Sequence, residues 1–274
     1  MEPIRIVCIA GPTASGKSAR AVERALQDAG EIISVDSRQV YRTLDIGTEK
    51  VTRDEMRGVP HHLIDVRDPS DTYSAGDFVE DATKYIEDIH ARGKLPILAG
   101  GTHFYFDALL HGLPPQTPPD PAFREGLEAY SSSELYERIH ELDPARAAML
   151  DPMNRRRLIR ALEILNVYKS VPERIPNARY EVEWIRIEPE RVELRARIDT
   201  RLKNAFARGL IDEVERVRKD VGDERLEELG LEYRIVGEYL RGEREESTLM
   251  PALSAKLWQY AKRQMMWLRK LASA

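Results

Sequence analysis

The chain has 274 residues, enough for one large α/β domain and a small second unit, and its 42% hydrophobic and 32% charged residues are typical of a globular protein. A net charge of −5 gives no general affinity for nucleic acid, so any such function has to come from local basic patches. The single cysteine excludes intramolecular disulfides and cysteine-rich zinc modules, and no signal peptide or membrane-spanning apolar run is visible, so we expect a cytoplasmic protein.

An apolar run at residues 4–10 predicts a buried strand, and a helical pattern begins soon after it. Between them lies a segment with the G-x-x-x-x-G-K-[ST] spacing of a phosphate-binding loop: Gly11-Pro12-Thr13-Ala14-Ser15-Gly16-Lys17-Ser18. Its glycines allow successive backbone N–H groups to face one phosphate cluster, and the helix N-terminus adds partial positive charge. We expect Lys17 to contact the outer phosphate oxygens, and the Ser18 hydroxyl suits Mg²⁺. An ordinary strand-to-helix turn would not need Gly-Lys-Ser together.

Three further strands are predicted in the first half of the chain, at residues 31–36, 61–66 and 95–99. A capping box at residues 74–77 begins a helix before the last of them, and Gly93 ends that helix. Short apolar strands that alternate with amphipathic helices favour an α/β fold, a P-loop parallel sheet with helices on both faces.

Polar features follow several of these strands. The phosphate-binding loop follows the first, Asp36 ends the second, and Gly100-Gly101-Thr102 follows the fourth, so all three should line one crevice at the carboxyl edge of the sheet. Asp36 could hold Mg²⁺, accept a proton from an acceptor substrate, or simply cap a turn. The other strands lack a carboxylate suited to nucleotide hydrolysis. We therefore expect one phosphorylated donor and one acceptor, and not a motor or switch ATPase.

The composition changes at residues 113–121, which hold five of the sixteen prolines. The pattern is then helical to about residue 170, alternates at residues 180–188 as a returning strand should, and is helical again, with Pro251 expected to open the last helix. The predicted domains are the first part of the catalytic core at 1–115, a small all-helical insertion at 116–180, and the rest of the core at 181–274.

Arginines cluster in the helical insertion, where four of them occupy residues 155–160. Such a group could bind a polyanion bidentately, or it could form a salt-bridged helix surface with Glu163 as one partner. A second group, Arg191, Arg195, Arg197 and Arg201, follows the returning strand. Some of its members could close on a diphosphate, whereas the others must lie at the surface.

Taken together, these features resemble the tRNA dimethylallyltransferases, also called tRNA isopentenyltransferases (the IPP transferase family), of the bacterial type. The resemblance covers nearly the whole chain. Besides the phosphate-binding loop it rests on Asp36-Ser37-Arg38-Gln39-Val40-Tyr41, Asp45-Ile46-Gly47-Thr48 with Lys50, Pro60-His61-His62-Leu63-Ile64-Asp65, Tyr73-Ser74-Ala75, Gly100-Gly101-Thr102 with Tyr105, Asn154 with Arg157, Arg160-Ala161-Leu162-Glu163, and Lys262-Arg263-Gln264 with Trp267.

The resemblance implies a transferase that moves a dimethylallyl group from dimethylallyl diphosphate to N6 of the adenosine 3′-adjacent to the tRNA anticodon, with release of diphosphate. It implies catalytic roles for Asp36 as general base, Thr102 and Lys17, and Mg²⁺ on Ser18. The diphosphate would be bound by residues 11–18 with Arg191 and Arg197. The implied tRNA-binding residues are Asp36, Ser37, Arg38, Gln39, Thr102, Arg124, Asn154, Arg156, Arg157, Arg160 and Arg234.

Two other functions share the same loop: a small-molecule kinase that uses ATP, and a prenyltransferase that acts on free adenine nucleotides. An arginine-rich helical insertion favours tRNA, because a small acceptor needs no such surface. The expected partners are therefore the anticodon arm of tRNA and dimethylallyl diphosphate, with no membrane, and the expected state is a monomer.

Overall fold

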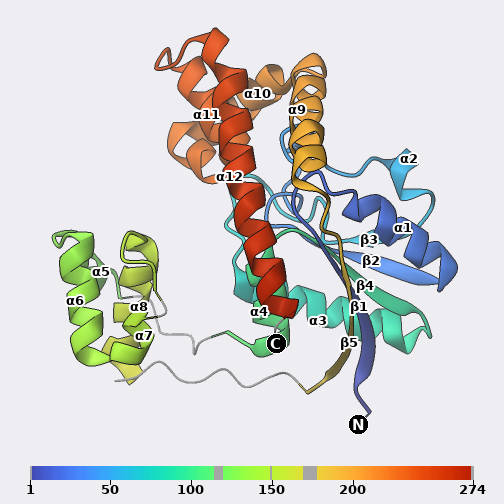
Figure 1. Cartoon of the computed structure of the whole chain (residues 1–274), viewed down its shortest axis with the longest axis horizontal. Coiled ribbons are helices and arrows are strands. Elements are labelled where there is room, and N and C mark those ends of the chain that lie inside the picture. Colours follow the sequence, from blue (N-terminus) through green and yellow to red (C-terminus); the bar gives the residue numbers. More distant parts are fainter. Residues whose placement is uncertain (1, 114–119, 149, 169–177, 273–274) are drawn as a thin grey trace. The chain divides into compact units, whose positions relative to one another are not determined.

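The computed structural model of the chain describes residues 2–113, 120–148, 150–168 and 178–272, without the side chains of 270–272. The chain forms two compact units, which we call the core (Met1–Leu110 with Ala178–Ala274) and the insertion (His111–Asn177) (Figure 1). Most of the proline-rich segment lies outside the described residues. Tyr180 is already part of a core strand, so the core resumes slightly before the expected boundary at residue 181.

The core is built on one five-stranded sheet in which every pair of neighbouring strands is parallel. Its spatial order is β3-β2-β4-β1-β5, so the first strand lies between β4 and the returning strand β5. The strands are β1 (Ile4–Ala10), β2 (Gly30–Val35), β3 (His61–His62), β4 (Leu95–Gly100) and β5 (Tyr180–Arg186).

Strand β3 is shorter than the sequence predicts. The apolar pattern extends to residue 66, but pairing with β2 ends at His62. Leu63 and Asp65 both have positive φ angles, 60° and 57°. This left-handed backbone cannot continue a strand, so the prediction for residues 63–66 was wrong.

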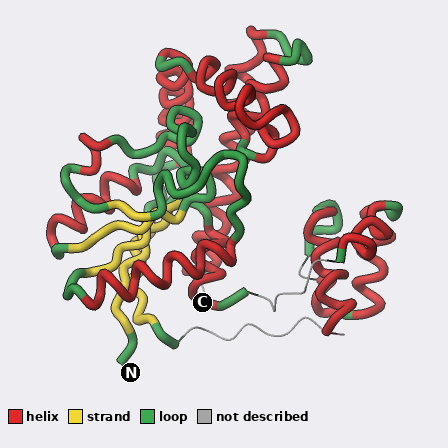
Figure 2. The backbone as a smooth tube through the Cα atoms, turned by 180° about the vertical axis from the view of Figure 1, so that it is seen from behind, coloured by secondary structure: helices red, strands yellow, loops and turns green. Residues whose placement is uncertain are grey.

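Neighbouring side chains of each central strand point to opposite faces of the sheet, as the pleat requires. Ile6 and Cys8 belong to one buried cluster, and Val7 and Ile9 belong to another. Helix α1 (Lys17–Gln27) covers the second cluster, and α3 (Ala75–Ala91) and α4 (His103–His111) cover the first. Helices therefore lie on both faces, as predicted (Figure 2).

The second half of the core is helical. Helix α12 begins at Glu246, not at Pro251 as the sequence predicted. Leu249 in the added turn is only 1% exposed, and its packing keeps this turn helical although a proline interrupts the hydrogen bonding. The other helices of this part are α9 (Arg191–Ala207), α10 (Leu210–Glu228) and α11 (Leu231–Leu240), and the short α2 (Arg53–Met56) lies between β2 and β3.

The described residues of the insertion form helices and contain no strand. They are α5 (Pro121–Glu128), α6 (Ser132–Leu142), α7 (Pro144–Ala148) and α8 (Arg155–Tyr168). The insertion has a hydrophobic cluster of its own, in which Leu135, Ile139 and Leu158 are fully buried. Within the described ranges of the whole chain, no helix is long and apolar enough to cross a membrane.

Candidate active site

The phosphate-binding loop connects β1 to α1 in a conformation that needs its two glycines. Gly16 has a φ of 86°, in the left-handed region, and precedes the first helical residue, Lys17. A Cβ on Gly11 would lie 2.5 Å from the Ser15 hydroxyl, so a larger residue would displace the loop. That hydroxyl is buried, and no described residue hydrogen-bonds to it. A buried polar atom of this kind in a phosphate-binding loop fits an oxygen atom of a ligand.

A cavity of about 730 Å³ opens beside this loop and brings the predicted segments together. Its walls include Lys17 and Ser18 of the loop, Asp36 at the end of β2, and Gly100 and Gly101 at the end of β4. Helix α12 adds a fourth wall with Leu257, Tyr260, Arg263 and Gln264. The carboxyl ends of three strands therefore meet at one crevice, where ligands of parallel sheets commonly bind.

Lys17 lies in the interior of this cavity. Its Nζ donates a hydrogen bond to the Pro12 carbonyl oxygen at 3.3 Å. Burial lowers the pKa of Lys17 to about 8, against the attraction of Asp36, and the positive charge of Arg201 lowers it further. An anion in the cavity would favour the charged form of this amine.

Asp36 uses only one carboxylate oxygen for the fold. Its Oδ1 accepts hydrogen bonds from the backbone N–H groups of Arg38 at 2.9 Å and Gln39 at 3.3 Å, which is the turn-capping role. Its Oδ2 accepts no hydrogen bond from any residue in the described part of the chain. The neighbouring Thr102 hydroxyl accepts a hydrogen bond from the Ser37 N–H at 3.0 Å, which joins the ends of β2 and β4. The capping role and a role in proton transfer are therefore compatible, because each uses a different oxygen.

The arginines of α9 reach the loop unequally. Arg197 donates to the Ser15 carbonyl oxygen at 3.3 Å and forms an ion pair with Glu193 at 2.6 Å. Arg201, which follows it by one turn, donates to the Thr13 hydroxyl and lines the cavity. Arg191 is exposed at the start of α9 and does not line the cavity. The structure thus places Arg197 and Arg201 at the loop and Arg191 away from it.

Gln264 of α12 connects two of the cavity walls, and only the family resemblance pointed to it. Its Oε1 accepts a hydrogen bond from the Thr13 N–H at 2.8 Å, and its Nε2 donates to the Gly101 carbonyl oxygen at 2.9 Å. The side chain is only 4% exposed. One turn further on, Trp267 stacks on His103, with ring centroids 4.2 Å apart. Helix α12 is therefore fixed to the loops that follow β1 and β4.

Glu213 of α10 is a residue that the sequence analysis missed. Its carboxylate is 1% exposed and accepts hydrogen bonds from the backbone N–H groups of Asp45, Ile46 and Gly47, at 3.0, 2.7 and 2.9 Å. The Tyr233 hydroxyl donates a fourth, at 2.8 Å. These hydrogen bonds hold the loop at residues 45–50, which forms one side of the cavity. The sequence separation of the partners leaves no local pattern that could have revealed them.

The residues expected to bind tRNA in the core differ in their surroundings. Ser37, Arg38 and Gln39 line the cavity. The Gln39 side chain is already engaged, because its Nε2 donates to the carbonyl oxygens of Thr48 and Glu49, at 3.3 and 3.1 Å. Arg234 is exposed on α11 and does not line the cavity.

In the insertion, the expected arginines fall into two groups. Arg124 and Arg160 both form ion pairs with Glu163, at 3.5 and 3.1 Å, as the alternative of a salt-bridged surface required. Arg156 and Arg157 are exposed and form no ion pair with any described residue. Asn154 accepts a hydrogen bond from the Arg157 N–H at 3.3 Å and so caps α8.

No protein-only metal cage accompanies these residues. The described residues contain no group of three or more His, Cys, Asp or Glu side chains that could hold a metal ion. Ser18 is exposed at the start of α1 and lines the cavity, so its hydroxyl is available to a cation that is shared with a ligand.

A parallel α/β sheet, a glycine-rich loop with the spacing of phosphate-binding loops and a carboxylate at the end of β2 define an α/β protein with a candidate site for a phosphorylated ligand. The model of the IPP transferase family matches residues 39–271. This match covers most of the chain, which therefore belongs to the IPP transferase family.

Individual relatives agree with this assignment. The chain is 42% identical over 276 residues to the tRNA dimethylallyltransferase of Thermomicrobium roseum, a match that covers 97% of this chain and 84% of the relative. Among solved structures it is similar to the tRNA isopentenylpyrophosphate transferase of Bacillus halodurans, with 39% identity, a TM-score of 0.74 and coverage of 97% and 87%. It is also similar to a eukaryotic dimethylallyltransferase solved acting on tRNA, with 28% identity, a TM-score of 0.76 and coverage of 96% and 69%.

Proposed function

We propose that this chain is a tRNA dimethylallyltransferase. It transfers the dimethylallyl group of dimethylallyl diphosphate to N6 of the adenosine on the 3′ side of a tRNA anticodon and releases diphosphate. The observation that carries the proposal is that Lys17 and Asp36 both line one cavity of about 730 Å³, large enough for a diphosphate donor and an adenine. The names of the relatives support the choice of donor and acceptor.

The proposed chemistry divides between the two sides of the cavity. The phosphate-binding loop and Lys17 stabilise the negative charge that develops on the diphosphate as its bond to the allylic carbon breaks and the diphosphate keeps the electron pair. The N6 amine attacks that carbon, and Asp36 Oδ2 accepts the proton that the amine loses. Thr102 holds the end of β4 against Ser37 and so keeps the acceptor side in place.

Mg²⁺ is part of the proposal. The Ser18 hydroxyl would hold it together with oxygen atoms of the diphosphate, a donor set that suits this cation. When bound, it would neutralise charge on the leaving group. The buried, unpartnered Ser15 hydroxyl fits such a bound diphosphate.

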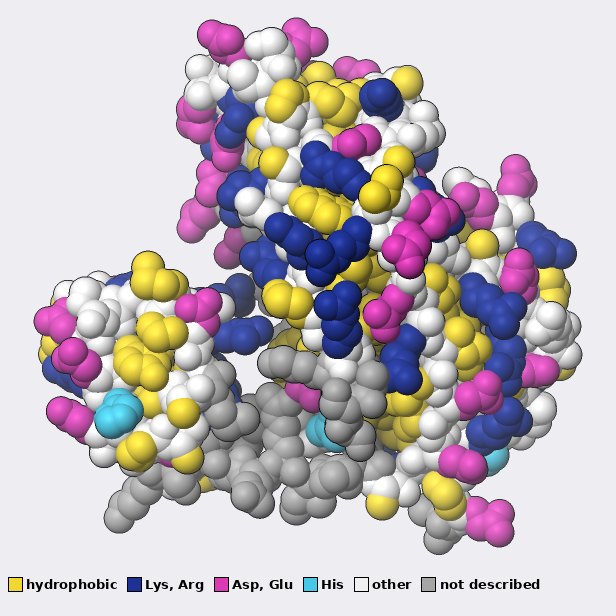
Figure 3. Space-filling view, in the orientation of Figure 1, with side chains coloured by type: hydrophobic (Ala, Val, Ile, Leu, Met, Phe, Trp, Pro, Cys, Tyr) yellow, Lys and Arg dark blue, Asp and Glu magenta, His cyan; other side chains and the backbone are white. Residues whose placement is uncertain are grey.

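The basic surface supports an RNA acceptor. Helix α12 exposes Lys256, Lys262, Arg263 and Arg269, and its residues 251–269 include no acid. In Figure 3, basic side chains gather over this part of the core. The insertion adds Arg156 and Arg157, which are exposed. We propose that these groups pair with tRNA phosphates and that the enzyme acts as a cytoplasmic monomer.

One assay separates this function from its alternatives. The purified protein is given labelled dimethylallyl diphosphate or ATP together with unmodified tRNA or AMP. We expect label in tRNA alone, whereas label in AMP, or ATP consumption with a small acceptor, would overturn the proposal.

The Asp36→Asn variant tests the general base. Asparagine keeps the oxygen that caps the turn but cannot take a proton, so turnover should fall by about 10²- to 10⁴-fold while tRNA binding is retained. Asp220→Asn is the control, because Asp220 is exposed on α10 and does not line the cavity. An active Asp36→Asn enzyme would exclude the role of Asp36 as base.

A further inference from the structure

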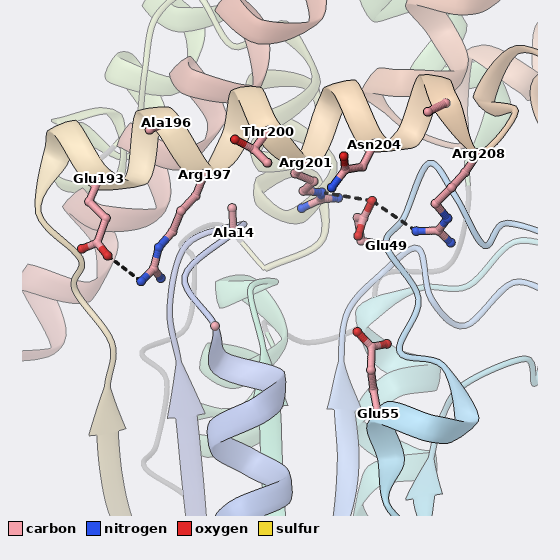
Figure 4. A pocket seen from close by; sticks show the side chains of 12 residues that line it. Ala14, Glu49, Glu55, Glu193, Ala196, Arg197, Thr200, Arg201, Asn204 and Arg208 are labelled. Atoms are coloured by element: carbon pink, nitrogen blue, oxygen red, sulfur yellow. Dashed lines mark hydrogen bonds and ion pairs between the residues drawn. The ribbon is translucent and has the colours of Figure 1, made fainter.

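A second cavity, of about 880 Å³, adjoins the phosphate-binding loop beneath α9 (Figure 4). We call it the outer cavity, and the first one the catalytic cavity. Ala14 and Gly16 of the loop, together with Glu49, Glu55 and Arg201, line both. Because the two cavities share these residues, Glu49 and Arg201 lie at their junction, directly beside the loop that receives the diphosphate.

Glu49 faces two arginines across this junction. Its Oε1 lies 3.8 Å from Nε of Arg201 and 3.7 Å from a terminal nitrogen of Arg208, which directly follows α9. Figure 4 shows its carboxylate between the two guanidinium groups. These separations are too long for hydrogen bonds, and Oε1 is buried without a hydrogen-bond partner among the described residues. The attraction is therefore electrostatic and loosely fitted, and either arginine can turn to another anion.

The backbone holds Glu49 firmly in this position. Glu49 has a φ of 51°, a left-handed conformation that non-glycine residues rarely adopt. Its carbonyl oxygen accepts a hydrogen bond from Gln39 Nε2 at 3.1 Å, and Glu213 fixes residues 45–47 just before it. The backbone of Glu49 is thus fixed beside the junction, and its carboxylate, which forms no hydrogen bond with any described residue, reaches both arginines from there.

Arg201 is shared between this carboxylate and the phosphate-binding loop. Besides facing Glu49, it donates a hydrogen bond to the Thr13 hydroxyl. A diphosphate in the loop would be a stronger partner than the loose carboxylate, because phosphate oxygens accept two parallel hydrogen bonds from one guanidinium. When the diphosphate leaves, Glu49 would again compensate the charge of both arginines.

We propose that Glu49 is a positioning residue that competes with the diphosphate for Arg201 and Arg208. The inference rests on the proposed function and adds a control of product release to it. The Glu49 carboxylate repels the diphosphate and pairs with the arginines when the diphosphate leaves them. It therefore lowers the affinity of the enzyme for its diphosphate product. The outer cavity gives the departing anion a path away from the loop, and its lining includes Arg197, Arg201 and Arg208 together with Glu55 and Glu193.

The experiment compares wild type with Glu49→Gln, Arg208→Gln and the double variant, and uses inorganic pyrophosphate as the probe. Its affinity is measured by calorimetry, and its inhibition of prenyl transfer to tRNA is measured in steady state. We expect Glu49→Gln to bind pyrophosphate about fivefold more tightly and Arg208→Gln about threefold more weakly, effects expected for single charges at a partly exposed site. The double variant, with its site charge restored, should return close to wild type.

Glu238→Gln is the matched control. Glu238 pairs with Arg244 at 2.6 Å and is 27% exposed against 31% for Glu49, but it lines neither cavity. Its replacement should leave pyrophosphate affinity unchanged. A comparable gain in this variant would show that removal of any surface carboxylate has the effect, and would overturn the inference.

The remaining outcomes are distinct. If folded Glu49→Gln binds pyrophosphate no more tightly than wild type, the ion pairs of Glu49 are only structural and the inference is overturned. The proposed function would stand, because wild type would still bind pyrophosphate and modify tRNA. A wild type that binds no pyrophosphate contradicts the proposed function itself. Should Glu49→Gln not fold, Arg208→Gln decides, since Arg208 is exposed, and an affinity equal to that of wild type would refute the competition.

Discussion

Lys17 is a buried amine whose charge depends on what occupies the cavity. Because its pKa is lowered to about 8, a growing fraction of the free protein carries neutral Lys17 as the pH rises through this value. Diphosphate binds the charged form, so affinity for pyrophosphate should fall from about pH 7 to about pH 9, approaching tenfold per pH unit above the pKa. Lys17→Arg keeps its charge over this range.

Calorimetric titrations of both proteins across that range check this prediction. Pyrophosphate itself gains and loses protons, but that change is common to the two proteins and cancels in their comparison. The wild-type affinity should fall more steeply than that of Lys17→Arg. Parallel curves would mean that Lys17 remains charged throughout.

Single residues were predictable from the sequence where their chemistry is local. The spacing of residues 11–18 and the position of Asp36 at a strand end depend only on neighbours in the chain, and both lie at the catalytic cavity. Gln264 and Glu213 form hydrogen bonds with residues far away in the sequence, and no residue spacing predicts such partners. The role proposed for Glu49 could not be predicted either, because it depends on Arg201 and Arg208, which lie far from Glu49 in the sequence.

At the scale of elements, α10 fixes the loop at residues 45–50 through the Glu213 carboxylate. Glu213→Gln replaces one acceptor oxygen with a donor that faces backbone N–H groups, so we expect a loss of about 2–4 kcal/mol in the free energy of unfolding. Tyr233→Phe removes only one of the four hydrogen bonds and should cost about 1 kcal/mol. Denaturant unfolding of the two variants gives both values. Equal costs would show that the backbone donors do not depend on this carboxylate.

Element boundaries were less predictable than element types. The strands at the centre of the sheet follow from their apolar runs, since both faces are buried. The end of β3 depends on two left-handed residues, Leu63 and Asp65, that carry no glycine signal. The start of α12 depends on Leu249, whose burial by tertiary packing overrides the usual position of proline in a first turn.

At the scale of the whole molecule, the proposed ligands of the diphosphate lie in the core, whereas the exposed Arg156 and Arg157 lie in the insertion. Replacing Arg156 and Arg157 by Gln should weaken tRNA binding and reduce the slope of log affinity against log salt by about 0.7–0.9 for each phosphate that is no longer neutralised. Pyrophosphate affinity should not change, because its proposed ligands all lie in the core.

The control for this charge change is the Lys84→Gln, Lys219→Gln variant. Both lysines are exposed in the core and pair with a glutamate one helical turn away. Filter binding at several salt concentrations compares the two variants. Equal losses of tRNA affinity would attribute the effect to net charge instead of to the insertion.

The helical insertion in the core could be predicted from the sequence, because a proline-rich segment precedes it and its apolar residues recur at helical and not at strand spacing. The sequence could not predict the strand order β3-β2-β4-β1-β5, which is set by pairing between distant segments. It offered Glu163 as a partner of the arginine cluster, and Arg160 lies one helical turn from it, but it could not show that Arg124 also meets Glu163 in the folded unit.

The hydrogen bonds of Gln264 have a consequence for the order of events during synthesis. The loop at residues 11–18 is synthesised well before Gln264, yet the Thr13 N–H and the Gly101 carbonyl oxygen find their acceptor and donor only in that side chain. A nascent chain that stops before residue 264 has the phosphate-binding sequence without the helix that braces it. Such a fragment should therefore not sequester isoprenoid diphosphates, and the loop becomes competent only after residue 264 has been synthesised.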